Sequence, residues 1–236
     1  MNRIRVFSSG FLFVFAIYCL LKNPNLPFNL PSWVYLLTTI YFTIFPIKDM
    51  IAAFNTTLYK GRQFSKKYIP NNQLDLINFK NIVQEYNKRA FWSLVFWLIF
   101  LLIPGILYLT GYLERIWIFV FFALSNFSVF FAIFGWCPFN SIFIKPECCM
   151  ECRIYNWDSF FQYSFLIFIP SPYTIWLFCL GLISMLEWEY MHYKHPEHFY
   201  KISNNNLSCE NCDLDACRKH KKKLFHKTLK DEYQNK

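Results

Sequence analysis

The feature that most constrains this chain is a series of long apolar stretches with few charges. Four of them, at residues 6–21, 33–54, 91–113 and 116–136, reach or approach the length of about 20 residues that a helix needs to cross a bilayer. Hydrophobic residues make up 55% of the chain and charged residues 17%, which exceeds what a soluble domain has to bury. We therefore expect an all-α, polytopic membrane protein.

A fifth apolar region, residues 159–186, is interrupted by Pro170, Ser171 and Pro172. Ser171 is a favourable N-cap, and Pro172 suits the first helical position because its missing N–H costs nothing there. We predict about four full spans followed by a C-terminal hairpin hinged at these prolines. A single kinked helix is the alternative.

Basic residues are distributed unequally between the connecting segments. Eight lie between residues 48 and 89, whereas the turns at 22–32 and 114–115 hold one each. The positive-inside rule places the middle loop in the cytoplasm, and a C-terminal hairpin then places both termini there too. A single fifth crossing would put the tail outside. The first stretch lacks a small-residue cleavage site, so we interpret it as an uncleaved anchor rather than a signal peptide.

These features divide the chain into six segments. They are two N-terminal membrane segments (1–54), a cytoplasmic amphipathic loop (55–90), a transmembrane hairpin (91–136), a cysteine-rich cytoplasmic loop (137–158), the Pro-hinged membrane segment (159–190) and a basic tail with Cys and His (191–236). Apolar residues at helical spacing in the second segment predict an amphipathic helix, which either lies on the membrane or extends the third span.

Two cysteine pairs have the C-x2-C spacing that presents two thiolates to one metal ion. If the hairpin brings both pairs to the cytoplasmic face, they can share one ion. We predict a four-cysteine zinc site there. The predicted ligands are Cys149, Cys152, Cys209 and Cys212, with Cys148 and Cys217 as substitutes.

Other states of these cysteines stay open. An iron–sulfur cluster also takes four thiolates, disulfides would form if the tail were outside, and the thiols could remain unligated. Cys19 and Cys179 lie in apolar runs and are interpreted as small hydrophobic residues. The favoured hypothesis is a non-enzymatic, metal-stabilised membrane protein. The alternative is a membrane redox protein that uses an iron–sulfur cluster or a dithiol/disulfide pair.

Glu189, His192 and His195 would share one face of a helix, so they are a further candidate metal set. The alternative is a polar belt at the membrane interface, with Pro196 ending the helix.

Polar residues also occur within the apolar regions. Asn126 and Ser128 in the fourth span are expected to join helices rather than to form a transport site. Asp158 is expected to cap the next helix and to bind Arg153, with a role beside the metal as the alternative.

The pattern Cys-Cys-x2-Cys-Arg-Ile-x-Asn-Trp-Asp, followed by His-Pro-Glu-His-Phe and C-x2-C, resembles uncharacterised bacterial polytopic membrane proteins over roughly the C-terminal half. This resemblance implies a bacterial inner membrane and no particular activity. The chain has no phosphate-binding glycine loop and no nucleophile motif. With a net charge of +9, its basic tail is expected to contact anionic lipid headgroups, and no nucleic-acid partner is expected.

Overall fold

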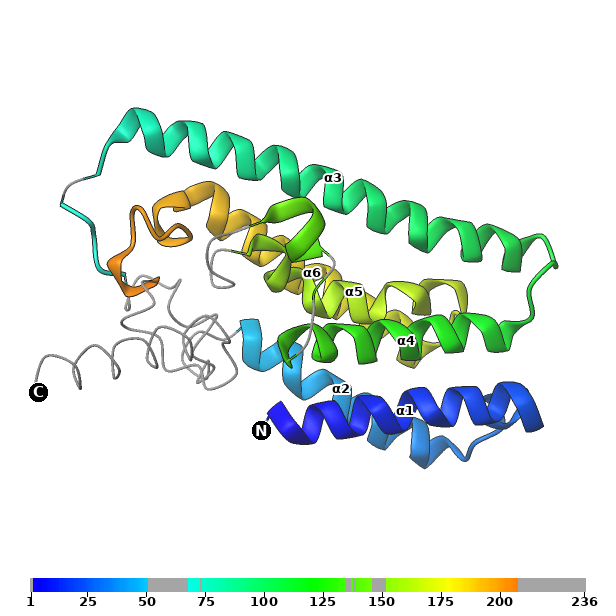
Figure 1. Ribbon diagram of the computed structural model, residues 1–236. Coiled ribbons are helices and arrows are strands. Elements are labelled where there is room, and N and C mark those ends of the chain that lie inside the picture. The colour runs from blue at the N-terminus through cyan, green and yellow to red at the C-terminus, as the bar shows by residue number, and fades with distance from the viewer. Residues whose placement is uncertain are drawn as a thin grey trace, which may run out of the picture.

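The computed structural model describes residues 2–50, 68–72, 74–134, 137, 139–145 and 152–207, and this part of the chain is a bundle of helices. The long helices are α1 (Asn2–Lys22), α2 (Ser32–Met50), α3 (Leu76–Leu109), α4 (Arg115–Phe134) and α6 (Pro172–Lys194). Helices α1 and α3 run in one direction and α2, α4 and α6 in the other (Figure 1). The predicted all-α class is confirmed for the described residues, whose only extended pairing is an isolated bridge between Pro70 and Asn204.

The segment between α4 and α6 forms the centre of the bundle. It consists of η6 (Arg153–Trp157), α5 (Asp158–Tyr163) and η7 (Ser164–Phe168). It runs from the end of the bundle where α3 begins to the end where α6 begins (Figure 1). A 3-10 helix rises about 2.0 Å per residue against 1.5 Å for an α-helix, so this short segment spans roughly 29 Å, about the thickness of a bilayer core.

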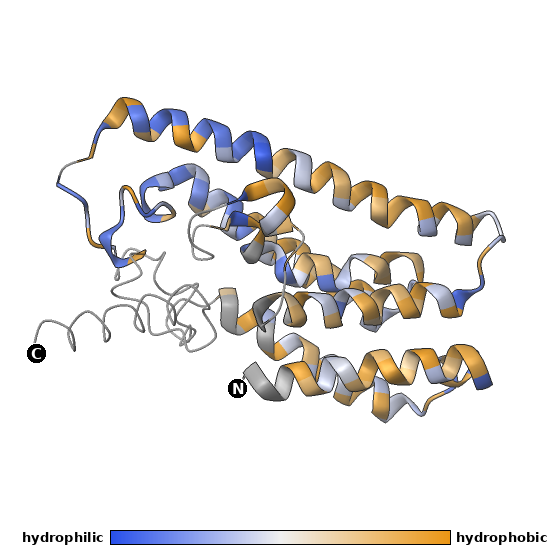
Figure 2. Ribbon diagram, in the orientation of Figure 1, coloured by the Kyte–Doolittle hydropathy of each residue, from blue (hydrophilic) through white to orange (hydrophobic). Residues whose placement is uncertain are grey.

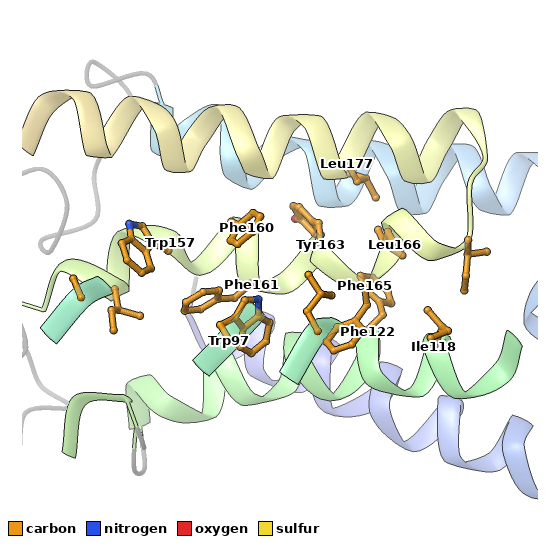
Figure 3. Packing of buried hydrophobic residues seen from close by; sticks show 14 of the residues in the cluster. Trp97, Ile118, Phe122, Trp157, Phe160, Phe161, Tyr163, Phe165, Leu166 and Leu177 are labelled. Atoms are coloured by element: carbon orange, nitrogen blue, oxygen red, sulfur yellow. The ribbon is translucent and has the colours of Figure 1, made fainter. Parts of the chain in front are cut away.

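Aromatic side chains of this central segment pack toward both neighbouring layers. The ring of Phe161 lies 4.4 Å from the ring of Trp97 on α3, and that of Phe165 lies 5.4 Å from Phe121 on α4. Figure 3 shows Phe161 and Phe165 on the central segment, which lies between α6 and α4. On the other side, α6 approaches closely at Gly181, where a Cβ would lie 2.8 Å from the carbonyl oxygen of Ser159.

A proline in α2 explains one tertiary hydrogen bond of the core. Pro46 lies inside α2 and has no N–H to give to the carbonyl of Phe42, four residues earlier. The hydroxyl of Tyr163 donates to that carbonyl at 2.9 Å. Buried carbonyls need a partner, so this contact joins the central segment to α2.

The predicted break in the last apolar region is confirmed. The Ser171 hydroxyl accepts from the main-chain N–H of Thr174 at 3.2 Å, and Pro172 is the first residue of α6. The first arm of the hairpin differs from a simple helix, because only its middle six residues are α-helical. Its 3-10 ends make it longer than an α-helix with the same number of residues would be.

The predicted third span and the predicted amphipathic helix form one continuous helix. Helix α3 has 34 residues and starts at the N-cap Asp75, whose carboxylate accepts from the N–H groups of Ile77 and Asn78. The amphipathic part is therefore an extension of the predicted span rather than a separate surface helix. Of the helices described, α3 alone is long and apolar enough to cross a membrane by length and composition.

Asn126 is a buried helix–helix contact, as predicted. Its side-chain NH₂ donates to the carbonyls of Phe122 at 3.1 Å and of Gln162 at 3.4 Å, which links α4 to α5. Ser128 is exposed and takes no such part among the contacts found.

Candidate functional site

Polar residues gather at the end of the bundle where α3 begins and α6 ends (Figure 2). We call this region the headpiece and define it as residues 68–72, 74–90 and 187–207 together with Arg153. It has a small aromatic core of its own, formed by Phe79, Trp188, Phe199 and Tyr200. The headpiece is where the structure brings together the side chains able to carry chemistry.

The start of the tail is hydrogen-bonded to the end of the middle loop. The N–H of Asn71 donates to the carbonyl of Ser203 at 3.1 Å, and that of Asn205 donates to Ile69 at 2.8 Å. The fully buried Asn204 side chain accepts from the N–H of Ile69 at 3.2 Å. These bonds join segments that are about 135 residues apart in the sequence and place them at one end of the bundle.

Arg153 connects three elements of the headpiece. Its guanidinium binds the carboxylate of Glu189 on α6 with two nitrogens, one of them at 2.9 Å, and also donates to Asn87 on α3. Trp157 donates its indole N–H to the same carboxylate at 2.7 Å. Burial opposes ionisation of Glu189, but these partners outweigh it and lower its pKa. The prediction that Arg153 binds Asp158 is wrong: its carboxylate partner is Glu189.

His192 is a buried neutral side chain. Burial and, as a smaller effect, the charge of Arg153 lower its pKa to about 4, while Glu189 acts in the opposite direction. Its Nε2 is hydrogen-bonded to the hydroxyl of Tyr200 at 2.9 Å. Since Glu189 and His192 are engaged elsewhere, the hypothesis that they converge with His195 on one ion is wrong.

A different set of side chains converges just beyond α6. The possible ligand atoms of His195, Glu197 and His198 all lie within 4.8 Å of one another. The sequence-based prediction did not include this set, because it assumed that the helix continues through His195, whereas α6 ends at Lys194. Pro196 one residue further on was the signal for a turn there.

The predicted cysteine ligands are only partly within the described residues. Cys152 lies directly before η6 and is 5% exposed, at the headpiece end of the central segment. The other predicted ligands lie outside the described residues. They are Cys148, Cys149, Cys209, Cys212 and Cys217. The four-cysteine site therefore stays a prediction.

Comparison with known proteins gives no family assignment. No protein-family model matches the chain, and no match was found among curated proteins or solved structures.

Proposed function

We propose that the chain is a multi-span protein of a bacterial inner membrane, whose cytoplasmic headpiece is held together by a structural metal ion bound to cysteines. The proposal has two parts, immersion in lipid and metal-linked closure of the cytoplasmic face. No catalytic step is part of it.

The observation that carries the first part is the apolar outer surface of the bundle. Large apolar side chains point outward from several helices, including Phe11 on α1 (74% exposed), Trp33 on α2 (63%), Ile103 on α3 (56%) and Trp176 on α6 (51%). Soluble monomers rarely expose such continuous apolar surface. A protein partner would cover one side, whereas lipid chains cover every side, so we assign this surface to lipid.

The dimensions of the helices agree with a bilayer. The apolar part of α3, residues 91–109, has a length of roughly 28 Å at 1.5 Å per residue. Charged and polar residues of α3 and α6 lie beyond this length, in the headpiece (Figure 2). The hydrocarbon boundary then falls near Ala90 and Leu186, and the headpiece lies in water.

The order of the elements supports a shared side for the middle loop and the tail. The central segment runs away from the headpiece and α6 returns to it (Figure 1). The hydrogen bonds between residues 69–71 and 203–205 require both segments on one side. The lysine-rich middle loop favours the cytoplasm for that side.

The second part rests on the described residues that adjoin the two cysteine segments, Cys152 and Leu207. Cys152 is buried next to Arg153, and Leu207, two residues before Cys209, is fully buried at the same end of the bundle. In a reducing cytoplasm, clustered thiols act as metal ligands rather than as disulfides. A bound divalent ion keeps neighbouring thiolates deprotonated and replaces their repulsion by attraction.

The test is the metal content of cysteine variants of the full-length protein, purified in detergent without added metal. We expect about one cysteine-dependent zinc per chain in the wild type. Cys152→Ser, Cys212→Ser and the double variant should each lose a similar amount of it, because all three remove one site. Cys179→Ser, which changes an outward-facing thiol on α6, is the control. Full metal occupancy in both single variants would contradict a shared site, and iron with acid-labile sulfide would show a cluster instead.

A further inference from the structure

The chain turns sharply after α6, and the turn aligns two histidines. Pro196 starts the short 3-10 helix η8 (Pro196–His198), directly after the C-cap His195. Residues three apart in a 3-10 helix lie nearly one above the other. The rings of His195 and His198 are accordingly stacked, with centroids 5.0 Å apart and planes 9° from parallel.

The carboxylate of Glu197 lies beside both rings. Its Oε1 is 3.1 Å from Nδ1 of His195 and 3.8 Å from Nε2 of His198. A tetrahedral zinc ion with bonds of about 2.0–2.2 Å places neighbouring ligand atoms roughly 3.3–3.5 Å apart. The two observed distances bracket this value, so the three atoms can reach one ion once the two imidazole rings, which lie nearly parallel, turn their nitrogens toward it.

The main chain of this turn is held by the residues that follow it. The hydroxyl of Ser203 donates to the carbonyl of Glu197 at 2.6 Å, and the side chain of Asn204 donates to that of His198 at 2.9 Å. The ring of Tyr68 packs on His198 with centroids 4.6 Å apart. A turn held on both sides loses little further freedom when an ion binds, which favours binding.

The three side chains differ in exposure, so that one side of the cluster is accessible to solvent. His198 is 6% exposed, whereas His195 and Glu197 are 38% and 33% exposed. Water therefore reaches the cluster from the side of His195 and Glu197. Two imidazoles and one carboxylate with an open position is the ligand set of metal sites that keep a water or a substrate on the ion.

We propose that His195, Glu197 and His198 bind a divalent transition-metal ion such as Zn²⁺, with one coordination position open to water or a small anion. This site is separate from the cysteine site, because it offers only nitrogen and oxygen ligands. It stands whether or not the cysteines bind metal.

Cobalt titration separates the two kinds of site. Co²⁺ replaces Zn²⁺ in both, but only a thiolate-ligated ion gives a sulfur-to-cobalt charge-transfer band. The full-length protein in detergent is stripped with a chelator and titrated with Co²⁺. We expect one equivalent of Co²⁺ per chain to produce ligand-field absorption without increasing the sulfur-to-cobalt charge-transfer band.

Conservative variants test the assignment of ligands. His195→Gln and Glu197→Gln should each lower the affinity for that Co²⁺ ion. The loss should exceed the roughly 10- to 100-fold that removal of a residue hydrogen-bonded to a ligand costs. His192→Gln, one turn earlier on α6, is the matched control and should bind like the wild type. Because His195 is partly exposed, its variant should keep the wild-type proteolysis pattern even if Glu197→Gln does not. Cobalt uptake that is unchanged in His195→Gln, or that always carries the thiolate band, would overturn the proposal.

Discussion

The hydroxyl of Tyr163 donates a hydrogen bond to the main-chain carbonyl of Phe42, 2.9 Å away, at the position where Pro46 deprives α2 of a helical donor. The central segment thus completes the hydrogen bonding of a neighbouring helix. In an apolar environment no water can replace this donor, so the contact ties the fold of one element to the presence of the other.

This relationship predicts a coupling between two substitutions. Tyr163→Phe should lower the stability of the detergent-solubilised protein by about 1 kcal/mol, because the carbonyl of Phe42 loses its donor. In a Pro46→Ala background residue 46 supplies its own N–H, and the same change should cost close to nothing. Thermal unfolding of the four proteins measures the coupling. Equal costs in both backgrounds would show that the hydroxyl does not serve this carbonyl.

The buried His192 predicts loss of headpiece stability in mild acid. The unfolded chain binds a proton near the ordinary pKa of 6.5, whereas the folded state resists protonation down to a pKa of about 4. Stability from this residue is complete above pH 6.5 and falls by up to about 3 kcal/mol as the pH drops to 4. Glu189, whose pKa is lowered from 4.5, loses its contribution only at lower pH and acts outside most of this window.

Proteolysis of the headpiece as a function of pH measures this effect, because cleavage reports the population of opened molecules. His192→Gln keeps a polar group for the hydroxyl of Tyr200 but does not titrate, so its cleavage rate should rise less between pH 6.5 and 4.5. Parallel pH profiles for the two proteins would mean that His192 is protonated in the folded state as readily as in the unfolded one.

Asn204 predicts a second sensitive position. Its side chain accepts from the N–H of Ile69 and donates to the carbonyl of His198, and it is fully buried. Asn204→Asp replaces the donor by an oxygen facing that carbonyl and should cost about 2 kcal/mol or more. Asn81→Asp, at an exposed position on α3, is the control. Cleavage by a protease after residue 200 should increase in the first variant only, and protection of both would argue against the pairing of loop and tail.

Local signals in the sequence predicted the helices and the hinge well. Ser171 followed by Pro172 is a helix start that needs no knowledge of the rest of the chain, and α6 begins there. The 3-10 ends of the central segment were not predictable, because burial between α4 and α6 selects them rather than local propensity. The same holds for Tyr163, whose partner lies 121 positions away.

The sequence predicted where the candidate site lies better than it predicted which residues form it. Charge and polarity indicated the headpiece end, but Arg153 and Glu189 are 36 residues apart, and nothing local in the sequence pairs them. The predicted metal ligands differ from the observed cluster because the prediction extended the helical spacing through His195. A 3-10 turn brings Glu197 and His198 to it instead.

The proposed topology is tested most directly by the side of the membrane on which Lys236 lies. Alkaline phosphatase, which is active only when exported, is fused after Tyr112 in the turn between α3 and α4 and, separately, after Lys236. We expect an active fusion at Tyr112 and an inactive one at Lys236, because the headpiece and the tail share the cytoplasmic side. A strongly active fusion after Lys236 would place the tail outside and would contradict both the loop–tail pairing and the shared metal site.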